Sequence, residues 1–220
     1  MTCLLTMPRF ASVIIDVDST LCGIEGIDWL AARRGPAVSA EIVRLTERAM
    51  EGTIALEAIY GHRLALVRPT TADVAGLARA YADALAPGAR EAIFRLRGEG
   101  IVVALVSGGI RQAIRPLARE LGFSDGSLHA VSLSFGDTGE FLGYDEKSPL
   151  ATEHGKKDLA ARLELPRPSL AVGDGVTDAA MREATDAFAA FTGFVRREPA
   201  VQVADYVITS FRELTDLVLP

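Results

Sequence analysis

Side chains that can do chemistry stand at four places in the chain, each close to a short apolar run. The first place is Asp16–Thr20 (DVDST), directly after the run Phe10–Ile15. Where a strand ends and the chain turns, both carboxylates can converge, so that Asp16 attacks an electrophile while Asp18 moves protons. For this pair alone, an aspartate that caps the next helix is the better interpretation.

A hydroxyl and two glycines follow the second apolar run. Ser107, Gly108 and Gly109 come directly after Ile101–Val106. A hydroxyl together with N–H groups at the start of a helix forms an anion site, and glycine allows a phosphate to approach the backbone. The simpler interpretation is a serine that caps a helix after a flexible turn.

Two adjacent lysines, Lys156 and Lys157, follow Gly155 and open a predicted helix. A lysine there can neutralise the charge of a phosphate and the charge that develops in the transition state. Solvated surface lysines are the more common meaning of such a pair. Chemistry alone does not separate Lys156 from Lys157.

Two aspartates four residues apart follow the run Leu170–Val172, within Gly173–Asp178 (GDGVTD). Mg²⁺ prefers a few carboxylates together with waters and phosphate oxygens, so Asp174 is placed to bind this hard cation. Asp178 would orient the coordination shell or hold the lysine. An ordinary turn explains a Gly-Asp dipeptide, but it explains two aspartates at a third strand end poorly.

Each group is ambiguous alone, and the interpretation depends on their combination. A nucleophile, a proton donor, an anion site, a lysine and a metal-binding aspartate are the parts that phosphoryl transfer requires. The sequence therefore predicts that Asp16 accepts the phosphate of a small organic ester, with Mg²⁺ as the cofactor.

The elements that must bring these groups together alternate between strand and helix. Unbroken apolar runs of this length are typical of strands buried on both faces, and Ala187–Phe191 is a fourth such run. The amphipathic segments between the runs are Pro87–Arg97, Gly109–Leu121, Lys156–Leu163 and Asp178–Ala184. This alternation predicts an α/β fold with a Rossmann-like doubly wound parallel sheet, whose ligands bind at the carboxyl ends of the strands. Pro116 should kink or restart the helix that contains it.

Residues 21–86 interrupt this alternation, because they contain helical patterns and no strong strand candidate. We therefore predict a helical cap over the strand ends, which sets substrate specificity, and a catalytic core formed by residues 1–20 and 87–220. The candidate helices of the cap are Ile24–Arg34, Ser39–Glu51, Ile54–Val67 and Thr71–Leu85. A second insertion from about His129 to Tyr144 alternates, turns at a glycine-rich segment and returns, which predicts a β-hairpin.

The overall composition and charge limit which classes of protein this chain can belong to. The chain has 220 residues, of which 49% are hydrophobic and 24% charged, and its net charge is −6. An acidic chain without a basic block favours neither nucleic acid nor an anionic membrane as a partner. Cys3 and Cys22 do not form a disulfide framework, and no long apolar run predicts a signal peptide or a membrane-spanning helix. We expect a cytoplasmic enzyme, monomeric or homodimeric, with a loose tail over residues 1–7.

With its motifs in this order, the chain resembles the haloacid dehalogenase superfamily from about Ser12 onward, and within it the phosphoserine phosphatases. The matching stretches are DxDST at Asp16–Thr20, EGID at Glu25–Asp28, RAMxG at Arg48–Gly52, RLAL at Arg63–Leu66, VSGG at Val106–Gly109, GK at Gly155–Lys156 and GDGxTD at Gly173–Asp178. The end of the hairpin, Gly143–Glu146, is similar to the flap of that family. The resemblance implies hydrolysis of O-phosphoserine to serine and phosphate, a step of serine biosynthesis.

The resemblance also implies roles that the residues alone leave open. Asp16 would be the nucleophile and a Mg²⁺ ligand. Asp18 would be the general acid and base, with its backbone carbonyl on the metal. Asp174 would be the last protein ligand of the metal. Asp178 would support these ligands without binding the metal itself. The residues implied to hold the phosphate are Ser107, Gly108 and Lys156, which selects Lys156 over Lys157.

The same resemblance implies a site for the amino-acid part of the substrate. Glu25 would pair with the ammonium and Arg63 with the carboxylate, since a zwitterion requires one anion and one cation at fixed positions. Met50 and Thr177 would lie nearby. Without the resemblance, Glu25 and Arg63 are solvated helix charges.

One position departs from the family pattern: Leu56 stands where the family usually places a phenylalanine, six residues after the methionine. A smaller side chain would widen the pocket, which leaves a phosphatase or phosphotransferase acting on another small phosphoester as an alternative. An alternative of another class is a receiver-like regulatory domain, which accumulates its phosphoaspartate. Such domains normally lack the second carboxylate and the helical cap. An inactive binding module is disfavoured because every catalytic position is filled.

Overall fold

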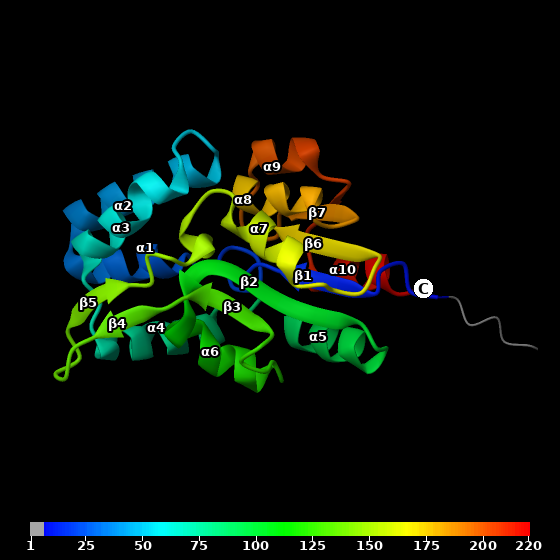
Figure 1. Cartoon of the computed structure of the whole chain (residues 1–220), viewed down its shortest axis with the longest axis horizontal. Helices are drawn as coiled ribbons and strands as arrows, with labels where there is room; N and C mark the ends of the chain where they lie inside the picture. The colour runs from blue at the N-terminus through cyan, green and yellow to red at the C-terminus, as the bar shows by residue number, and fades with distance from the viewer. Residues whose placement is uncertain (1–6) are drawn as a thin grey trace, which may run out of the picture.

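The computed structural model describes residues 7–220, so the expected tail over residues 1–7 lies, apart from Met7, outside the described residues. Six parallel strands form one sheet in the order β3-β2-β1-β6-β7-β8 (Figure 1). The strands are β1 Ser12–Ile15, β2 Val102–Ile110, β3 Leu128–Val131, β6 Ser169–Gly173, β7 Ala187–Phe191 and β8 Tyr206–Ile208. Every residue of β1, β6 and β7 is buried, as strands covered on both faces require.

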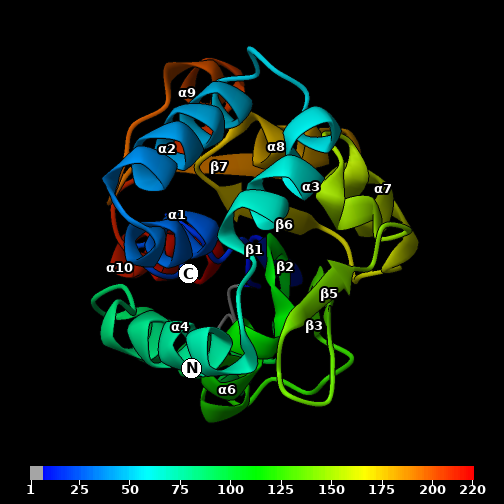
Figure 2. The same cartoon turned by 90° about the vertical axis from the view of Figure 1, so that its left-hand side faces the viewer.

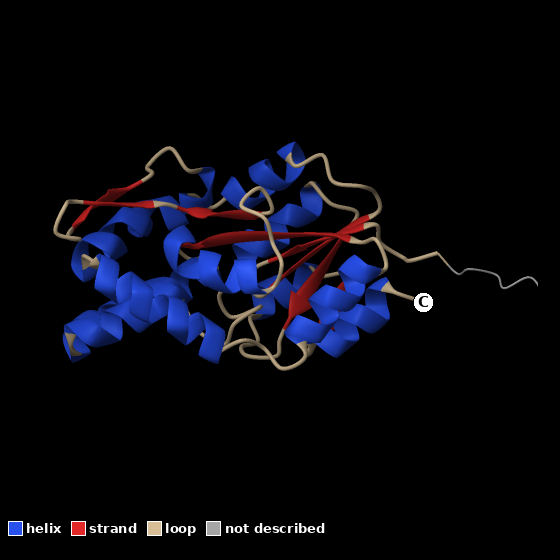
Figure 3. Cartoon of the chain, turned by 90° about the horizontal axis from the view of Figure 1, so that it is seen from below, coloured by secondary structure: helices blue, strands red, loops and turns tan. Residues whose placement is uncertain are grey.

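Helices cover both faces of this sheet. From β1 the chain adds β2 and β3 on one side, and it then crosses to add β6, β7 and β8 on the other. Because such crossovers are right-handed, the reversal puts α5 and α6 on one face and α7, α8 and α9 on the other (Figure 1). The helices are α5 Ala89–Gly98, α6 Arg111–Glu120, α7 Gly155–Arg162, α8 Val176–Ala179, α9 Glu198–Val203 and α10 Phe211–Val218, which packs against α5. Figure 3 shows the strands fanning out as the sheet twists between these layers. The predicted α/β fold is confirmed.

Four α-helices lie between β1 and α5, beyond the carboxyl ends of the strands (Figure 2). They are α1 Gly26–Ala31, followed by the 3₁₀ turn η1 Ala32–Arg34, then α2 Pro36–Met50, α3 Leu56–Val67 and α4 Thr71–Asp83. A capping box starts α4, because Thr70 accepts from the Asp73 amide while the Asp73 carboxylate accepts from the Thr70 amide. The hydrophobic core continues from Ile14 of the sheet into Leu30 and Leu64 of these helices. None of the helices in the described part of the chain is both long and apolar enough to cross a membrane.

A β-hairpin stands apart from the main sheet and contacts the inserted helices. Its strands, β4 Leu133–Phe135 and β5 Phe141–Tyr144, pair antiparallel. At its turn, the Gly139 carbonyl oxygen accepts a 2.9 Å hydrogen bond from the Thr71 amide at the start of α4. At its other end, the Tyr144 ring packs against the Tyr60 ring of α3, with centroids 5.2 Å apart. The hairpin is thus held to the inserted helices at both ends.

Some local expectations were wrong. The hairpin does not begin near His129, because β3 takes this segment into the main sheet beside β2. A short alternating run suits either position, so the pattern could not separate them. The three-residue edge strand β8 gave no signal of its own. Pro116 does not restart its helix: α6 runs through it, at the cost of one backbone hydrogen bond. The helix expected over Asp178–Ala184 is the short α8 followed by the 3₁₀ turn η3 Ala180–Glu183.

Candidate active site

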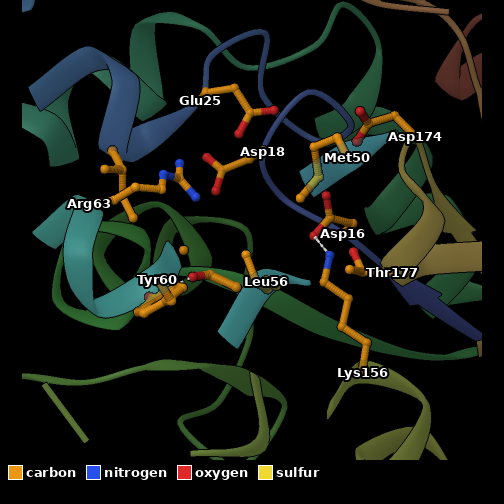
Figure 4. A pocket seen from close by; sticks show the side chains of 13 residues that line it. Asp16, Asp18, Glu25, Met50, Leu56, Tyr60, Arg63, Lys156, Asp174 and Thr177 are labelled. Carbon is orange, nitrogen blue, oxygen red and sulfur yellow. Dashed lines mark hydrogen bonds and ion pairs between the residues drawn. The ribbon is translucent and has the colours of Figure 1, made fainter. Parts of the chain in front are cut away.

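The structure brings the predicted groups together in one pocket. Neighbouring parallel strands β2, β1 and β6 end at the same edge of the sheet, so Ser107, Asp16 and Asp174 converge there. The inserted helices line the opposite side of this cavity. Its lining residues are Asp16, Asp18, Glu25, Ile27, Met50, Leu56, Tyr60, Arg63, Gly108, Gly109, Lys156, Asp174 and Thr177 (Figure 4).

Lys156 is the buried cation of this pocket. Its Nζ lies 2.5 Å from Asp16 Oδ1 and 2.6 Å from Asp178 Oδ1, and the side chain is only 7% exposed. Burial alone would lower the pKa of Lys156, but the facing carboxylates of Asp16 and Asp178 raise it above its ordinary value, so the ammonium stays charged. Lys157 points elsewhere and pairs with Glu183. The geometry therefore separates the two lysines, which the residue types could not do.

Three buried carboxylates surround this lysine. Oxygens of Asp16, Asp174 and Asp178 lie within 4.8 Å of one another. Burial raises the pKa of Asp16 and of Asp174, and repulsion from Asp178 raises both further. Clustered hard oxygen donors that repel one another fit a hard divalent cation, which would relieve the repulsion. Asp178 also accepts a 3.0 Å hydrogen bond from the Gly175 amide, which fixes the turn after β6.

Asp18 stands two residues beyond Asp16 and receives its hydrogen bonds from the inserted helices. Its Oδ1 accepts from the Tyr81 hydroxyl of α4 at 2.6 Å and from the Gly26 amide of α1 at 3.0 Å. Burial raises the pKa of Asp18 to about 6, although these two hydrogen bonds lower it. A carboxyl with this pKa can both give and take a proton near neutral pH.

The segment Ser107–Gly109 belongs to β2, which extends to Ile110 and does not end at Val106 as expected. Its pairing with β3 is irregular between Val106 and Ile110, so the backbone leaves the regular ladder here. Ser107 is fully buried, and its Oγ accepts from the Gly109 amide at 2.9 Å. A Cβ at Gly109 would lie 2.7 Å from Asp18 Oδ2, so a side chain at this position would displace Asp18.

The groups expected to bind the amino-acid part also face the pocket. Arg63 of α3 is buried, and its Nη2 lies 3.3 Å from Asp28 Oδ1. The Nε of Arg63 has no hydrogen-bond partner among the described residues. Glu25 accepts a 2.8 Å hydrogen bond from the Ser19 hydroxyl, and burial, with the charge of Asp18, raises its pKa to about 8. Figure 4 shows Glu25 and Arg63 on the same side of the pocket, with Asp18 between them.

Four further side chains contribute to the lining. Met50, at the end of α2, reaches over the pocket to the turn at Gly175 (Figure 4). Thr177 is buried at the start of α8. Leu56 is 5% exposed at the start of α3. One turn later in the same helix, Tyr60 contributes an aromatic ring to the lining, and its hydroxyl donates to the Gly108 carbonyl at 2.8 Å.

Sequence reasoning missed Arg197. This residue follows β7 and is 9% exposed at its side chain; its Nε donates to Asp174 Oδ2 at 2.7 Å and its Nη2 lies 3.5 Å from Glu25 Oε1. The signal that could have found it is its place after the fourth buried strand, at the same sheet edge. The sequence offered no reason to choose it over Arg196, which is 54% exposed and pairs with Glu198.

Comparisons with known proteins agree with this arrangement. The haloacid dehalogenase-like hydrolase family matches residues 10–186. A chloroplastic phosphoserine phosphatase of Arabidopsis thaliana is 36% identical, over 92% of this chain and 70% of that protein. The crystal structure of a phosphoserine phosphohydrolase-like protein from Francisella tularensis superposes with a TM-score of 0.87 at 26% identity, over 94% of this chain and 99% of that one. A phospho-aspartyl intermediate analogue of phosphoserine phosphatase superposes with a TM-score of 0.76 at 27% identity, over 94% and 98% of the two chains. The chain therefore belongs to the phosphoserine phosphatase family of the haloacid dehalogenase-like hydrolases.

Proposed function

We propose that this protein is a Mg²⁺-dependent phosphatase that hydrolyses O-phosphoserine through an aspartyl-phosphate on Asp16. The observation that carries the proposal is the convergence of Asp16, Asp18, Asp174 and Lys156 in one pocket. Membership of the family supports the reaction, and the likeness to the phospho-aspartyl intermediate analogue supports the covalent step.

The reaction divides into two displacements at phosphorus. In the first, a carboxylate oxygen of Asp16 attacks phosphorus, the bond from phosphorus to the serine oxygen breaks, and Asp18 gives that oxygen a proton. In the second, Asp18 takes a proton from a water molecule, whose oxygen attacks the aspartyl-phosphate. Phosphate leaves, and the Asp16 carboxylate is restored with Asp18 protonated again.

Residues of four segments would hold the transferred phosphate and a cation. Ser107, the Gly108 amide and Lys156 would bind phosphate oxygens. Gly108 and Lys156 line the pocket together with Asp16, and the buried Ser107 directly precedes Gly108. The Mg²⁺ ligands would be Asp16, the backbone carbonyl of Asp18, and Asp174. When bound, the cation supplies positive charge that neutralises the phosphate as charge moves to the leaving oxygen. Asp178 would act indirectly, because it holds Lys156 in place.

The remaining polar side chains would select the organic part of the ester. Arg63 lines the pocket, and its guanidinium suits a substrate carboxylate. Glu25 would pair with the ammonium, and Met50 and Thr177 would lie against the substrate. In this proposal α1 to α4, within residues 21–86, are the cap, and residues 1–20 and 87–220 are the catalytic core. Leu56 leaves more room than a phenylalanine, so phosphothreonine is the nearest competing substrate.

The test is phosphate release from O-phosphoserine, O-phosphothreonine and a sugar phosphate, with Mg²⁺ and with EDTA. We expect phosphate release from phosphoserine with Mg²⁺ and none with EDTA. The Asp16→Asn variant should lose this activity. Retention of activity in that variant would exclude the covalent mechanism. A preference for a substrate without ammonium or carboxylate would exclude the roles given to Glu25 and Arg63. A phosphoaspartate that persists for minutes without turnover would instead identify a receiver-like protein.

A further inference from the structure

Tyr81 reaches from α4 into the active site, although it is 63 residues away from Asp18 in the sequence. Its side chain is fully buried, and its hydroxyl donates to Asp18 Oδ1 at 2.6 Å. The Gly26 amide donates to the same oxygen at 3.0 Å. One oxygen of the Asp18 carboxyl is therefore held by two donors, and both come from the inserted helices.

The other oxygen of Asp18 faces the opposite way, toward the phosphate-binding segment. Asp18 Oδ2 lies 2.7 Å from the position that a Cβ at Gly109 would occupy. While the Tyr81 hydroxyl and the Gly26 amide both donate to Oδ1, its two lone pairs are occupied. In this arrangement, the proton of a protonated Asp18 is on Oδ2, the oxygen beside Gly109.

The glycine at position 26 and hydrogen bonds at the end of α4 hold the Tyr81 hydroxyl in this place. A Cβ at Gly26 would overlap the Tyr81 hydroxyl oxygen, so the close approach requires glycine there. The end of α4 is also tied to the loop after Asp18. The Cys22 thiol donates to the Tyr81 carbonyl at 3.4 Å, and the Gly23 amide donates to the Ala84 carbonyl at 2.9 Å.

We propose that Tyr81 is a positioning residue for proton transfer: its hydrogen bond to Oδ1 orients Asp18 so that Oδ2 delivers the proton to the leaving oxygen and later takes one from water. This inference rests on the proposed function, because it assigns Tyr81 a task within that reaction. The simpler interpretation is that Tyr81 is a buried tyrosine whose hydroxyl donates to a nearby acceptor and which only supports the packing of α4.

Two substrates whose leaving groups differ in their need for a proton can separate the two interpretations. The serine alkoxide needs a proton as it leaves phosphoserine. The leaving group of acetyl phosphate is acetate, a stable anion that needs no proton. The value of kcat/KM reports the steps up to transfer of the phosphate to Asp16, in which Asp18 is the acid. Loss of proton delivery therefore lowers kcat/KM for phosphoserine selectively. Loss of packing lowers it for both substrates.

The experiment measures kcat/KM for O-phosphoserine and acetyl phosphate in wild type, Tyr81→Phe, Asp18→Asn and the control Leu77→Ala. Leu77 is the packing control because it is buried in α4, one turn before Tyr81, and its side chain cannot hydrogen-bond to Asp18. The ratio of the two values on one sample does not depend on the folded fraction, so a poorly folded variant still gives an answer.

We expect Tyr81→Phe to lower kcat/KM for phosphoserine about 10- to 100-fold, part of what general acid catalysis contributes. For acetyl phosphate we expect a change within about twofold. Leu77→Ala, which only loosens the packing of α4, should leave the ratio of the two kcat/KM values unchanged. An equal loss for both substrates in Tyr81→Phe, while Asp18→Asn is selective, would overturn the role of Tyr81 and leave the proposed function standing. If Asp18→Asn is not selective either, the acid role of Asp18 fails and the role of Tyr81 fails with it.

Discussion

The buried ammonium of Lys156 allows a prediction about stability that is independent of activity. Lys156→Met keeps much of the side-chain volume but removes the charge that lies 2.5 Å from Asp16 and 2.6 Å from Asp178. Breaking a buried ion pair by deleting one partner costs about 3–5 kcal/mol, because the other charge remains buried and unpaired. For a chain of 220 residues, this corresponds to a fall in Tm of about 6–20 °C.

The assay is thermal unfolding in EDTA by calorimetry, with Lys157→Met as the matched control. Lys157 pairs with Glu183, whose side chain is 71% exposed, so its loss should cost at most about 1 kcal/mol. Excess Mg²⁺ should raise the Tm of Lys156→Met more than that of wild type, since a cation beside the same carboxylates replaces the missing charge. If the two lysine variants unfold at the same temperature in EDTA, the ammonium does not offset the buried carboxylates and the reasoning is refuted.

Other predictions follow from single residues. Arg63→Met should raise KM for phosphoserine at least about tenfold and change kcat/KM for acetyl phosphate little, because only the first substrate has a carboxylate; equal effects would contradict the assignment. Gly155→Ala should lower the Tm and the yield of folded protein, because its Cβ would overlap the carbonyl oxygen of Pro149. An unchanged Tm would show that the 3₁₀ turn η2 Pro149–Ala151 moves aside without cost. In EDTA the free energy of unfolding should fall as pH rises from about 5 to 8. Folded Glu25, with a pKa of about 8 against 4.5 in the unfolded chain, holds a proton that the unfolded chain has already released. Denaturant titrations at pH 6 and pH 8 check this, and Glu25→Gln should make the pH dependence shallower.

The parts of the site that the sequence could predict are those placed by strand ends. Asp16, Ser107 and Asp174 each follow or end a buried run, and parallel strands place such residues at one edge. The family resemblance of the motifs was confirmed by the comparisons. The selection of Lys156 came from that resemblance, and the ion pairs to Asp16 and Asp178 now give it a physical reason.

The parts that the sequence could not predict depend on contacts between distant segments. Tyr81 lies within the candidate helix Thr71–Leu85, and nothing near it in the chain is a hydrogen-bond partner for its hydroxyl. Arg197 stands beside Arg196, and the residue types do not separate the two. Both contact the site only through the arrangement of whole elements, α4 over the loop after β1 and the segment after β7 beside β6.

The attachment of the hairpin at both ends has a consequence for how the molecule exchanges its amide hydrogens. An isolated two-stranded hairpin is marginally stable in water. Here Thr71 holds its turn and Tyr60 packs on its last residue, Tyr144, so β4 and β5 gain the stability of α3 and α4. The hairpin and these helices should therefore open as one cooperative unit, with similar protection from hydrogen exchange.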